Sequence, residues 1–223
     1  MHLNRWQQHQ IYLSNTCNYQ CLGCALPTPQ KNIKHKIEAA KPNDIVNIYG
    51  GNPLEHPQCM EWVRFAFHKK LRVRLWTNHT VTNVPKKERA MIHELVLWCP
   101  SPIKETFNTI TGSDNFNAFW AAMRALDQPA TLAFRVRPIS FEFLPEFTDL
   151  VRSHNQSGML LYYPKEFTAE ENAYIKRFKR VQGMRVVPCN NSATPHCLSV
   201  PNTIGSAQFE YHDWCYAMRR TIT

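Results

Sequence analysis

The sequence has no long apolar run. None of its hydrophobic stretches reaches the ~20 residues that a helix needs to span a bilayer, and residues 1–6 lack the apolar core of a secretory signal. We therefore expect a cytoplasmic protein with no membrane partner. In a reducing compartment its eight cysteines are expected to be metal ligands or buried thiols rather than disulfides.

Charge is also sparse. Charged residues make up 19% of the 223 residues and hydrophobic residues 43%, a balance that excludes a disordered chain and favours one domain with a core. The formal net charge is +9. That excess suits an anionic substrate such as RNA, a nucleotide or an acidic peptide, but many basic proteins have no such partner, so charge alone decides nothing.

Three cysteines, Cys17, Cys21 and Cys24, stand within eight residues in the spacing C-x3-C-x2-C. Three such thiolates can ligate three irons of a cubane [4Fe–4S] cluster and leave the fourth iron open for chemistry. A structural site would normally be closed by a fourth protein ligand, which the motif lacks. The alternatives are zinc, with His9 or His35 as the missing ligand, and a disulfide, which would leave an odd thiol.

A second motif, Gly50-Gly51-Asn52-Pro53, follows a predicted strand at residues 44–49. Two glycines at a strand end allow the backbone to come close to a ligand. By itself the motif also fits a tight turn from strand to helix.

Strands and helices are predicted to alternate along the chain. The six predicted strands cover residues 11–13, 44–49, 72–78, 94–99, 130–138 and 158–163. A helix after Pro57 is expected to bury Met60, Val63 and Phe67, and residues 100–113 are expected to form a long turn-rich loop. Strict alternation predicts an α/β fold with a parallel sheet, whose sites gather at the carboxyl ends of the strands.

The cysteine spacing directly after a first strand, with Gly-Gly-x-Pro after the second, resembles the signature of the radical S-adenosylmethionine (SAM) superfamily. The resemblance implies that Cys17, Cys21 and Cys24 hold a [4Fe–4S] cluster. It implies that SAM chelates the open iron and is cleaved by an electron from the cluster to methionine and a 5′-deoxyadenosyl radical. It also implies a partial (β/α)6 TIM-like barrel over residues 1–183.

The resemblance extends to SAM-binding residues. It implies that the turn formed by Gly50, Gly51, Asn52 and Pro53 binds the SAM amino group, with Asn52 standing where the family has a glutamate. An amide oxygen can still accept a hydrogen bond, without the assistance of charge. The weaker candidates for the SAM pocket are Thr77, Asn78, Arg135 and Arg137.

Two details of that pocket are left open. Arg135 and Arg137 alternate with apolar residues and share one face of their strand, where they either pair with the SAM carboxylate or form ordinary salt bridges. Gly23 stands where the family has an aromatic or hydrophobic residue near the adenine, a contact that falls instead to Leu22 or Tyr19.

Residues 184–223 form a short Cys-rich C-terminal extension with Cys189, Cys197 and Cys215. It loosely resembles the extensions that hold auxiliary iron–sulfur clusters in radical SAM enzymes. We expect a second metal site there, a second [4Fe–4S] cluster ahead of zinc, with an open iron, a histidine ligand, or a fourth cysteine from Cys99 or Cys59. The alternative is three buried or free thiols.

The sequence therefore predicts a radical SAM enzyme that abstracts hydrogen from a peptide or protein. Two alternatives are kept: the same chemistry on a nucleotide or RNA, and a non-catalytic metal-binding protein on a degenerate scaffold. The resemblance implies a reducing partner such as flavodoxin or ferredoxin. The reaction outcome is left open.

Overall fold

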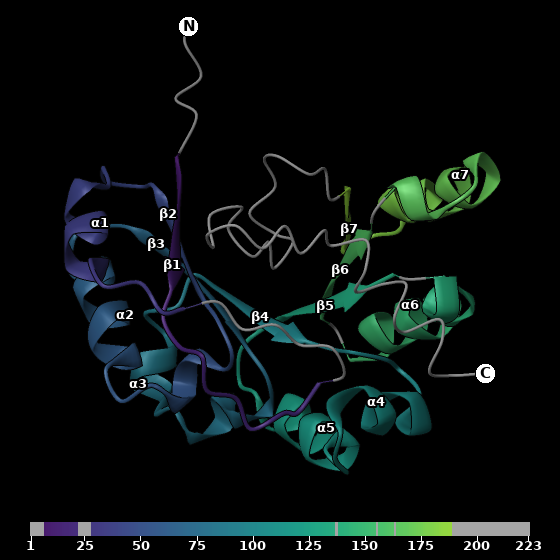
Figure 1. The fold of residues 1–223 in the computed structure, drawn as a ribbon, viewed down its shortest axis with the longest axis horizontal. Helices are drawn as coiled ribbons and strands as arrows, with labels where there is room; N and C mark the ends of the chain where they lie inside the picture. The colour runs from purple at the N-terminus through teal and green to yellow at the C-terminus, as the bar shows by residue number, and fades with distance from the viewer. Residues whose placement is uncertain (1–6, 22–27, 137, 155, 163, 189–223) are drawn as a thin grey trace, which may run out of the picture. The chain divides into compact units, whose positions relative to one another are not determined.

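The computed structural model describes residues 7–21, 28–136, 138–154, 156–162 and 164–188. Strands and helices alternate along them, as the labels and colours of Figure 1 show. Within these ranges no helix combines the length and the apolar surface needed to cross a membrane.

Seven strands form one sheet in the sequential order β1-β2-β3-β4-β5-β6-β7. The strands are β1 (Gln8–Tyr12), β2 (Ile45–Tyr49), β3 (Arg72–Thr77), β4 (Glu94–Trp98), β5 (Thr131–Arg135), β6 (Ser157–Tyr162) and β7 (Met184–Pro188). The pairs β1–β2, β2–β3, β3–β4 and β6–β7 are parallel. A sequential order of parallel strands is that of an open β/α barrel, whereas a doubly wound sheet reverses its order. The predicted fold class, a partial TIM-like barrel, is confirmed.

The helices fill the connections between the strands. They are α1 (Ile33–Ala39), α2 (Cys59–His68), α3 (Lys86–Arg89), α4 (Lys104–Thr111), α5 (Phe116–Ala125), α6 (Leu144–Ser153) and α7 (Ala169–Arg177). Short 3-10 helices add η1 (Pro53–Glu55), η2 (His79–Asn83), η3 (Pro138–Phe143), η4 (Pro164–Glu166) and η5 (Phe178–Arg180). α7 begins with a capping box at Thr168 and Glu171, whose side chains satisfy each other's backbone N–H groups.

The chain divides into two compact units. Unit 1 takes the described residues up to Asn18, with Thr28–Trp98 and Ala118–Thr131, and unit 2 takes the remaining described residues. In unit 1 the strands bury Ile11, Val46, Ile48, Val73 and Leu75 completely. In unit 2, Phe134 of β5 stacks on Phe147 of α6 with ring centroids 5.0 Å apart.

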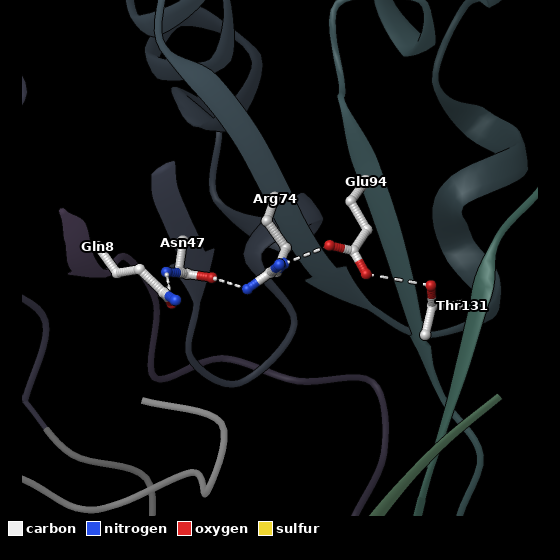
Figure 2. A network of polar contacts seen from close by, with 5 residues as sticks. All are labelled: Gln8, Asn47, Arg74, Glu94 and Thr131. Carbon is white, nitrogen blue, oxygen red and sulfur yellow. Dashed lines mark hydrogen bonds and ion pairs between the residues drawn. The ribbon is translucent and has the colours of Figure 1, made fainter. Parts of the chain in front are cut away.

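A polar row crosses the strands of unit 1 (Figure 2), on the face opposite Val46, Ile48, Val73 and Leu75. Arg74 donates to Glu94 at 2.6 Å and to Asn47 at 3.2 Å. Asn47 donates to Gln8 at 3.3 Å, and Thr131 donates to Glu94 at 3.1 Å. The row extends from β1 to β5 because residues in register on parallel strands point to the same side of a sheet.

The side chain of Asp44 also joins segments of unit 1. Asp44 accepts from His9 Nε2 at 3.0 Å and from the backbone N–H groups of Lys41 and Gln7, both at 2.9 Å. Burial by itself would raise the pKa of Asp44, but these hydrogen bonds outweigh it and the pKa lies below its ordinary value.

Three expectations from the sequence are corrected. A seventh strand, β7, pairs with β6 inside the segment assigned to the extension. Residues 104–111 form α4 rather than loop, because Phe107 and Thr111 lie four apart and are both buried. Helix α2 buries Cys59, Val63 and Ala66, while Phe67 is 43% exposed, so its inner face is turned from the one predicted.

Candidate functional site

The segment that follows β1 carries the first cysteine of the motif. Leu13 N donates to Tyr49 O at 2.8 Å, so β1 and β2 stay paired beyond their last assigned residues. Ser14 is buried, and its Oγ accepts from Thr16 N at 3.0 Å and lies 2.7 Å from Thr16 Oγ1. These bonds make a tight turn just before Cys17, which is partly exposed.

Gly50 and Gly51 press against that turn. Gly50 has φ +107° and Gly51 has φ +47°. A Cβ on Gly51 would lie 2.1 Å from the carbonyl oxygen of Thr16, and one on Gly50 would lie 2.7 Å from the Tyr12 ring. Asn52 N donates to Thr16 O at 2.8 Å. Only glycine combines this backbone conformation with so close an approach, so the two motifs are in direct contact.

Asn52 lies at the centre of a polar group that we call the Asn52 cluster. Its members are Asn18, Asn52, Glu55, Thr77, Asn78 and Thr80. Thr77 Oγ1 donates to Asn52 Oδ1 at 2.7 Å. Asn52 Nδ2 faces Thr80 Oγ1 at 2.7 Å, Glu55 Oε1 at 3.0 Å and Asn18 Oδ1 at 3.2 Å. Asn52 has no exposed surface, so its amide is used within the protein.

Asn78 connects the Asn52 cluster to the cysteine. Its Nδ2 donates to Asn18 Oδ1 at 2.6 Å and lies 4.0 Å from Cys17 Sγ. Its Oδ1 accepts from Thr80 N at 3.2 Å, which orients the amide. An N–H group directed at sulfur favours the thiolate and, when iron is bound, affects the reduction potential.

Glu55 and His79 set the electrostatics on the exposed side of the Asn52 cluster. Burial lowers the pKa of His79, and the nearby carboxylate of Glu55 opposes that shift. His79 is therefore neutral at pH 7, and its Nε2 lies 3.4 Å from Asn18 Nδ2. Glu55, by contrast, is exposed and brings a negative charge to this edge of unit 1.

Cys21 belongs to unit 2, where the segment before it contacts α4. Gln20 N donates to Thr111 O at 2.9 Å, and the ring of Tyr19 meets Phe107 edge-on at 6.1 Å. Gly112 has φ +68°, and a Cβ there would lie 2.8 Å from Gln20 O. The helix that the sequence analysis missed thus supports the middle of the cysteine motif.

Arg135 also lies in unit 2 and is buried at the end of β5. Because Phe134 stacks on α6, Arg135 points to the opposite face of the strand, as its alternation with Phe134 predicted. Arg137 lies outside the described residues, and so do Cys24 and its neighbours Leu22 and Gly23. The proposed second set, Cys189, Cys197 and Cys215, lies outside them as well.

Cys59 and Cys99 are buried thiols. Burial raises the pKa of Cys59 to about 12, and it raises the pKa of Cys99 as well. A metal binds the thiolate, which burial disfavours at both positions. Among residues the structure describes, no three His, Cys, Asp or Glu side chains gather at one point, and His9 is bonded to Asp44.

Sequence reasoning missed three members of the Asn52 cluster: Asn18, Glu55 and Thr80. Asn18 sits inside the cysteine motif, and Glu55 and Thr80 each stand three residues after a proposed SAM-binding residue. Their signal is a concentration of Asn and Thr just after β1, β2 and β3. Carboxyl ends of neighbouring parallel strands meet at one edge, so such side chains can meet there.

No family model matches the sequence, and no curated protein matches it. Solved structures match its fold. SuiB of Streptococcus suis aligns over 85% of this chain at 14% identity with a TM-score of 0.63, and it has also been solved bound to its precursor peptide SuiA and bound to S-adenosylmethionine. TYW1 with a lysine-pyruvate adduct bound aligns over 78% of this chain and 72% of its own, at 12% identity and a TM-score of 0.59.

The chain spans about half the length of SuiB, 53% of that chain. At these identities the likeness concerns the fold. The chain therefore shares the partial-barrel fold of proteins that include one solved with S-adenosylmethionine bound.

Proposed function

We propose that the protein is a radical SAM enzyme. Cys17, Cys21 and Cys24 are the proposed ligands of a [4Fe–4S] cluster, and the turn from Gly50 to Pro53 forms a wall of the SAM site. The observation that carries the proposal is the contact between the two motifs. Gly51 packs on Thr16 of the cysteine segment, and Asn78 Nδ2 reaches Cys17 Sγ at 4.0 Å.

The residues of unit 1 fit such a cofactor. Soft thiolates suit iron, and the Gly50–Gly51 turn lets backbone groups approach a ligand closely. When bound, a reduced cluster supplies the electron for reductive cleavage of SAM. The chain's own part is to bind and orient: Asn78 directs a donor toward Cys17 and Thr77 fixes Asn52.

The proposed substrate is a peptide or protein. SuiB, which shares the fold, has been solved with a precursor peptide bound. A nucleotide or RNA substrate is the second candidate and is compatible with the net charge of +9. A band shift of RNA that weakens steeply with added salt would support the second candidate. A reducing partner such as flavodoxin or ferredoxin, and a second metal held by Cys189, Cys197 and Cys215, belong to the same proposal.

The test is reductive cleavage of SAM by anaerobically reconstituted protein. Wild-type protein is expected to form 5′-deoxyadenosine, and Cys21→Ala is expected to form none and to lose iron. Cys59→Ala, which changes a buried thiol outside the motif, is the matched control. Full activity in Cys21→Ala, or no SAM binding by the reconstituted wild-type protein, would contradict the proposal and favour a degenerate scaffold.

The same preparation tests the second metal site. About eight irons and eight sulfides per chain would support two cubane clusters, whereas about four of each would leave only the cluster of the first motif.

A further inference from the structure

The turn after β2 places Glu55 beside Asn52. Pro53 opens η1, and Glu55 N donates to Asn52 O at 3.0 Å. In a 3-10 turn, side chains three residues apart lie over one another. The side chains of Asn52 and Glu55 therefore share one side of the turn, where Asn52 Nδ2 meets Glu55 Oε1 at 3.0 Å.

A side chain that binds a cation needs a negative charge and an accessible surface. Asn52 and Glu55 differ in both. Asn52 is wholly buried, and its carbonyl oxygen is bonded to Thr77, so it offers no charge and no accessible surface. Glu55 carries a charge and is exposed, and the bond from Asn52 restricts its rotation. The buried amide thus holds an accessible carboxylate in place.

The charge of Glu55 is not neutralised nearby. Within the described part of the chain, no Lys or Arg lies within ion-pair distance of it, and His79 is neutral at pH 7. The other members of the Asn52 cluster are amides and hydroxyls. A chain of polar contacts through Asn52, Asn18 and Asn78 joins Glu55 to Cys17. This edge of unit 1 therefore suits a cationic ligand.

We propose that Glu55, and not Asn52, provides the anionic contact to the α-ammonium group of S-adenosylmethionine. This inference rests on the proposed function, which supplies the ligand. SAM carries two cationic groups, the ammonium and the sulfonium. The ammonium donates hydrogen bonds and the sulfonium does not, so a carboxylate that is oriented by hydrogen bonding fits the ammonium.

The experiment compares ligand binding by reconstituted wild-type protein and Glu55→Gln. The substitution keeps the oxygen that accepts from Asn52 and removes the charge. SAM and S-adenosylhomocysteine both carry the ammonium, so Glu55→Gln is expected to weaken both by about tenfold or more. Methylthioadenosine lacks the amino-acid part and is expected to bind both proteins equally.

Glu61→Gln is the matched control, because Glu61 is an exposed carboxylate on α2 and makes only a 3.4 Å contact with Gln58. Its affinities and iron content should equal those of wild-type protein. If Glu55→Gln binds SAM as tightly as wild-type protein, the proposed role of Glu55 is wrong, while the proposed function still stands. Loss of SAM binding with S-adenosylhomocysteine unchanged would assign Glu55 to the sulfonium, and parallel loss of all three ligands would show a collapsed pocket. Absence of SAM binding by the wild-type protein would overturn the proposed function as well.

Discussion

The contribution of each buried polar residue at the site to stability depends on whether its polar atoms have hydrogen-bond partners. Asn52 shows this most clearly, since it is fully buried and yet satisfied by Thr77, Thr80, Glu55 and Asn18. A buried acceptor that loses its donor costs more than the bond itself contributes, because water cannot replace the donor. The geometry of the Asn52 cluster is therefore expected to be sensitive to single hydroxyl groups.

Thr77→Val should destabilise the protein by about 1–3 kcal/mol, because it leaves Asn52 Oδ1 buried without the donor now at 2.7 Å. Denaturant unfolding measures the loss. Thr82→Val makes the same chemical change at an exposed residue and should change stability by less than about 0.5 kcal/mol. Equal effects of the two substitutions would show that the hydroxyl of Thr77 is not needed.

Cys59→Ala and Cys99→Ala should leave the iron content of reconstituted protein unchanged. Both thiols are buried, and burial raises the pKa of each, to about 12 for Cys59, which disfavours the thiolate that iron binds. Iron and sulfide analysis is the measurement, with Cys17→Ala as the variant that should lose iron. A lower iron content in Cys99→Ala would indicate that Cys99 is an iron ligand.

Elements bring these residues together through turns and through side-chain pairs across strands. The Gly50–Gly51 turn lets β2 end directly against the segment after β1. The row from Gln8 to Thr131 links five strands through side-chain hydrogen bonds (Figure 2). The turn acts between two neighbouring strands and the row acts across five, so each can be tested at its own position.

Gly51→Ala should destabilise the protein by at least about 1 kcal/mol more than Gly183→Ala. Both glycines have positive φ, so both substitutions carry the strain of a left-handed residue, roughly 1–2 kcal/mol. Only the Cβ on residue 51 would also meet a backbone oxygen, at 2.1 Å, whereas the nearest atom to one on residue 183 is 3.7 Å away. Thermal or denaturant unfolding gives the difference, and equal losses would contradict the contact with Thr16.

Arg74→Met should lower the free energy of unfolding by about 2–3 kcal/mol. The change leaves the Glu94 carboxylate and Asn47 Oδ1 without the donor that Arg74 provides in a largely buried row. The control is Arg64→Met, which breaks the 2.6 Å pair with Glu88, where the arginine side chain is 43% exposed. That change should cost less than about 1 kcal/mol. Similar losses for the two variants would argue against the importance of the row.

For the whole molecule, acidic groups with lowered pKa values determine how stability depends on pH. Asp44 is one, and Asp127 is another, since hydrogen bonds from Lys86 and Arg89 lower its pKa. A lowered pKa means that the folded state favours the charged carboxylate. The stabilisation is fully present above the unfolded-state pKa, near 4, and is lost as pH falls through the folded-state pKa.

Asp44→Asn should therefore destabilise the protein at pH 7 by about 1–3 kcal/mol, the range for hydrogen bonds to a charged group. The difference from wild-type protein should shrink as pH falls below about 4. Unfolding free energies measured between pH 3 and pH 7 test this. Asp149→Asn, whose side chain is 79% exposed, should show almost no difference at any pH. A loss that persists at pH 3 would mean that the amide disturbs packing.

The fold class and the place of both motifs in the chain could be predicted from the sequence alone. Hydrophobic alternation and chain-order alternation of strands and helices are local properties, and they were enough to predict a parallel sheet with sites at its carboxyl edge. The sequence-based prediction was wrong about α4, which was expected to be loop, and about β7, which was not expected as a strand of the sheet. The packing of Phe107 and the pairing of Met184–Pro188 with β6 depend on neighbours distant in sequence.

The contacts among the site residues depend on the tertiary structure. Gly51 and Thr16 lie thirty-five positions apart, and nothing local says that one approaches the other's carbonyl. Asn52 reads in sequence as a polar ligand, but Thr77 from the next strand takes its carbonyl oxygen and leaves Glu55 as the exposed charge. Hydrogen-bond satisfaction is set by all the elements that meet at a point, so a local sequence pattern does not determine which side chain stays exposed.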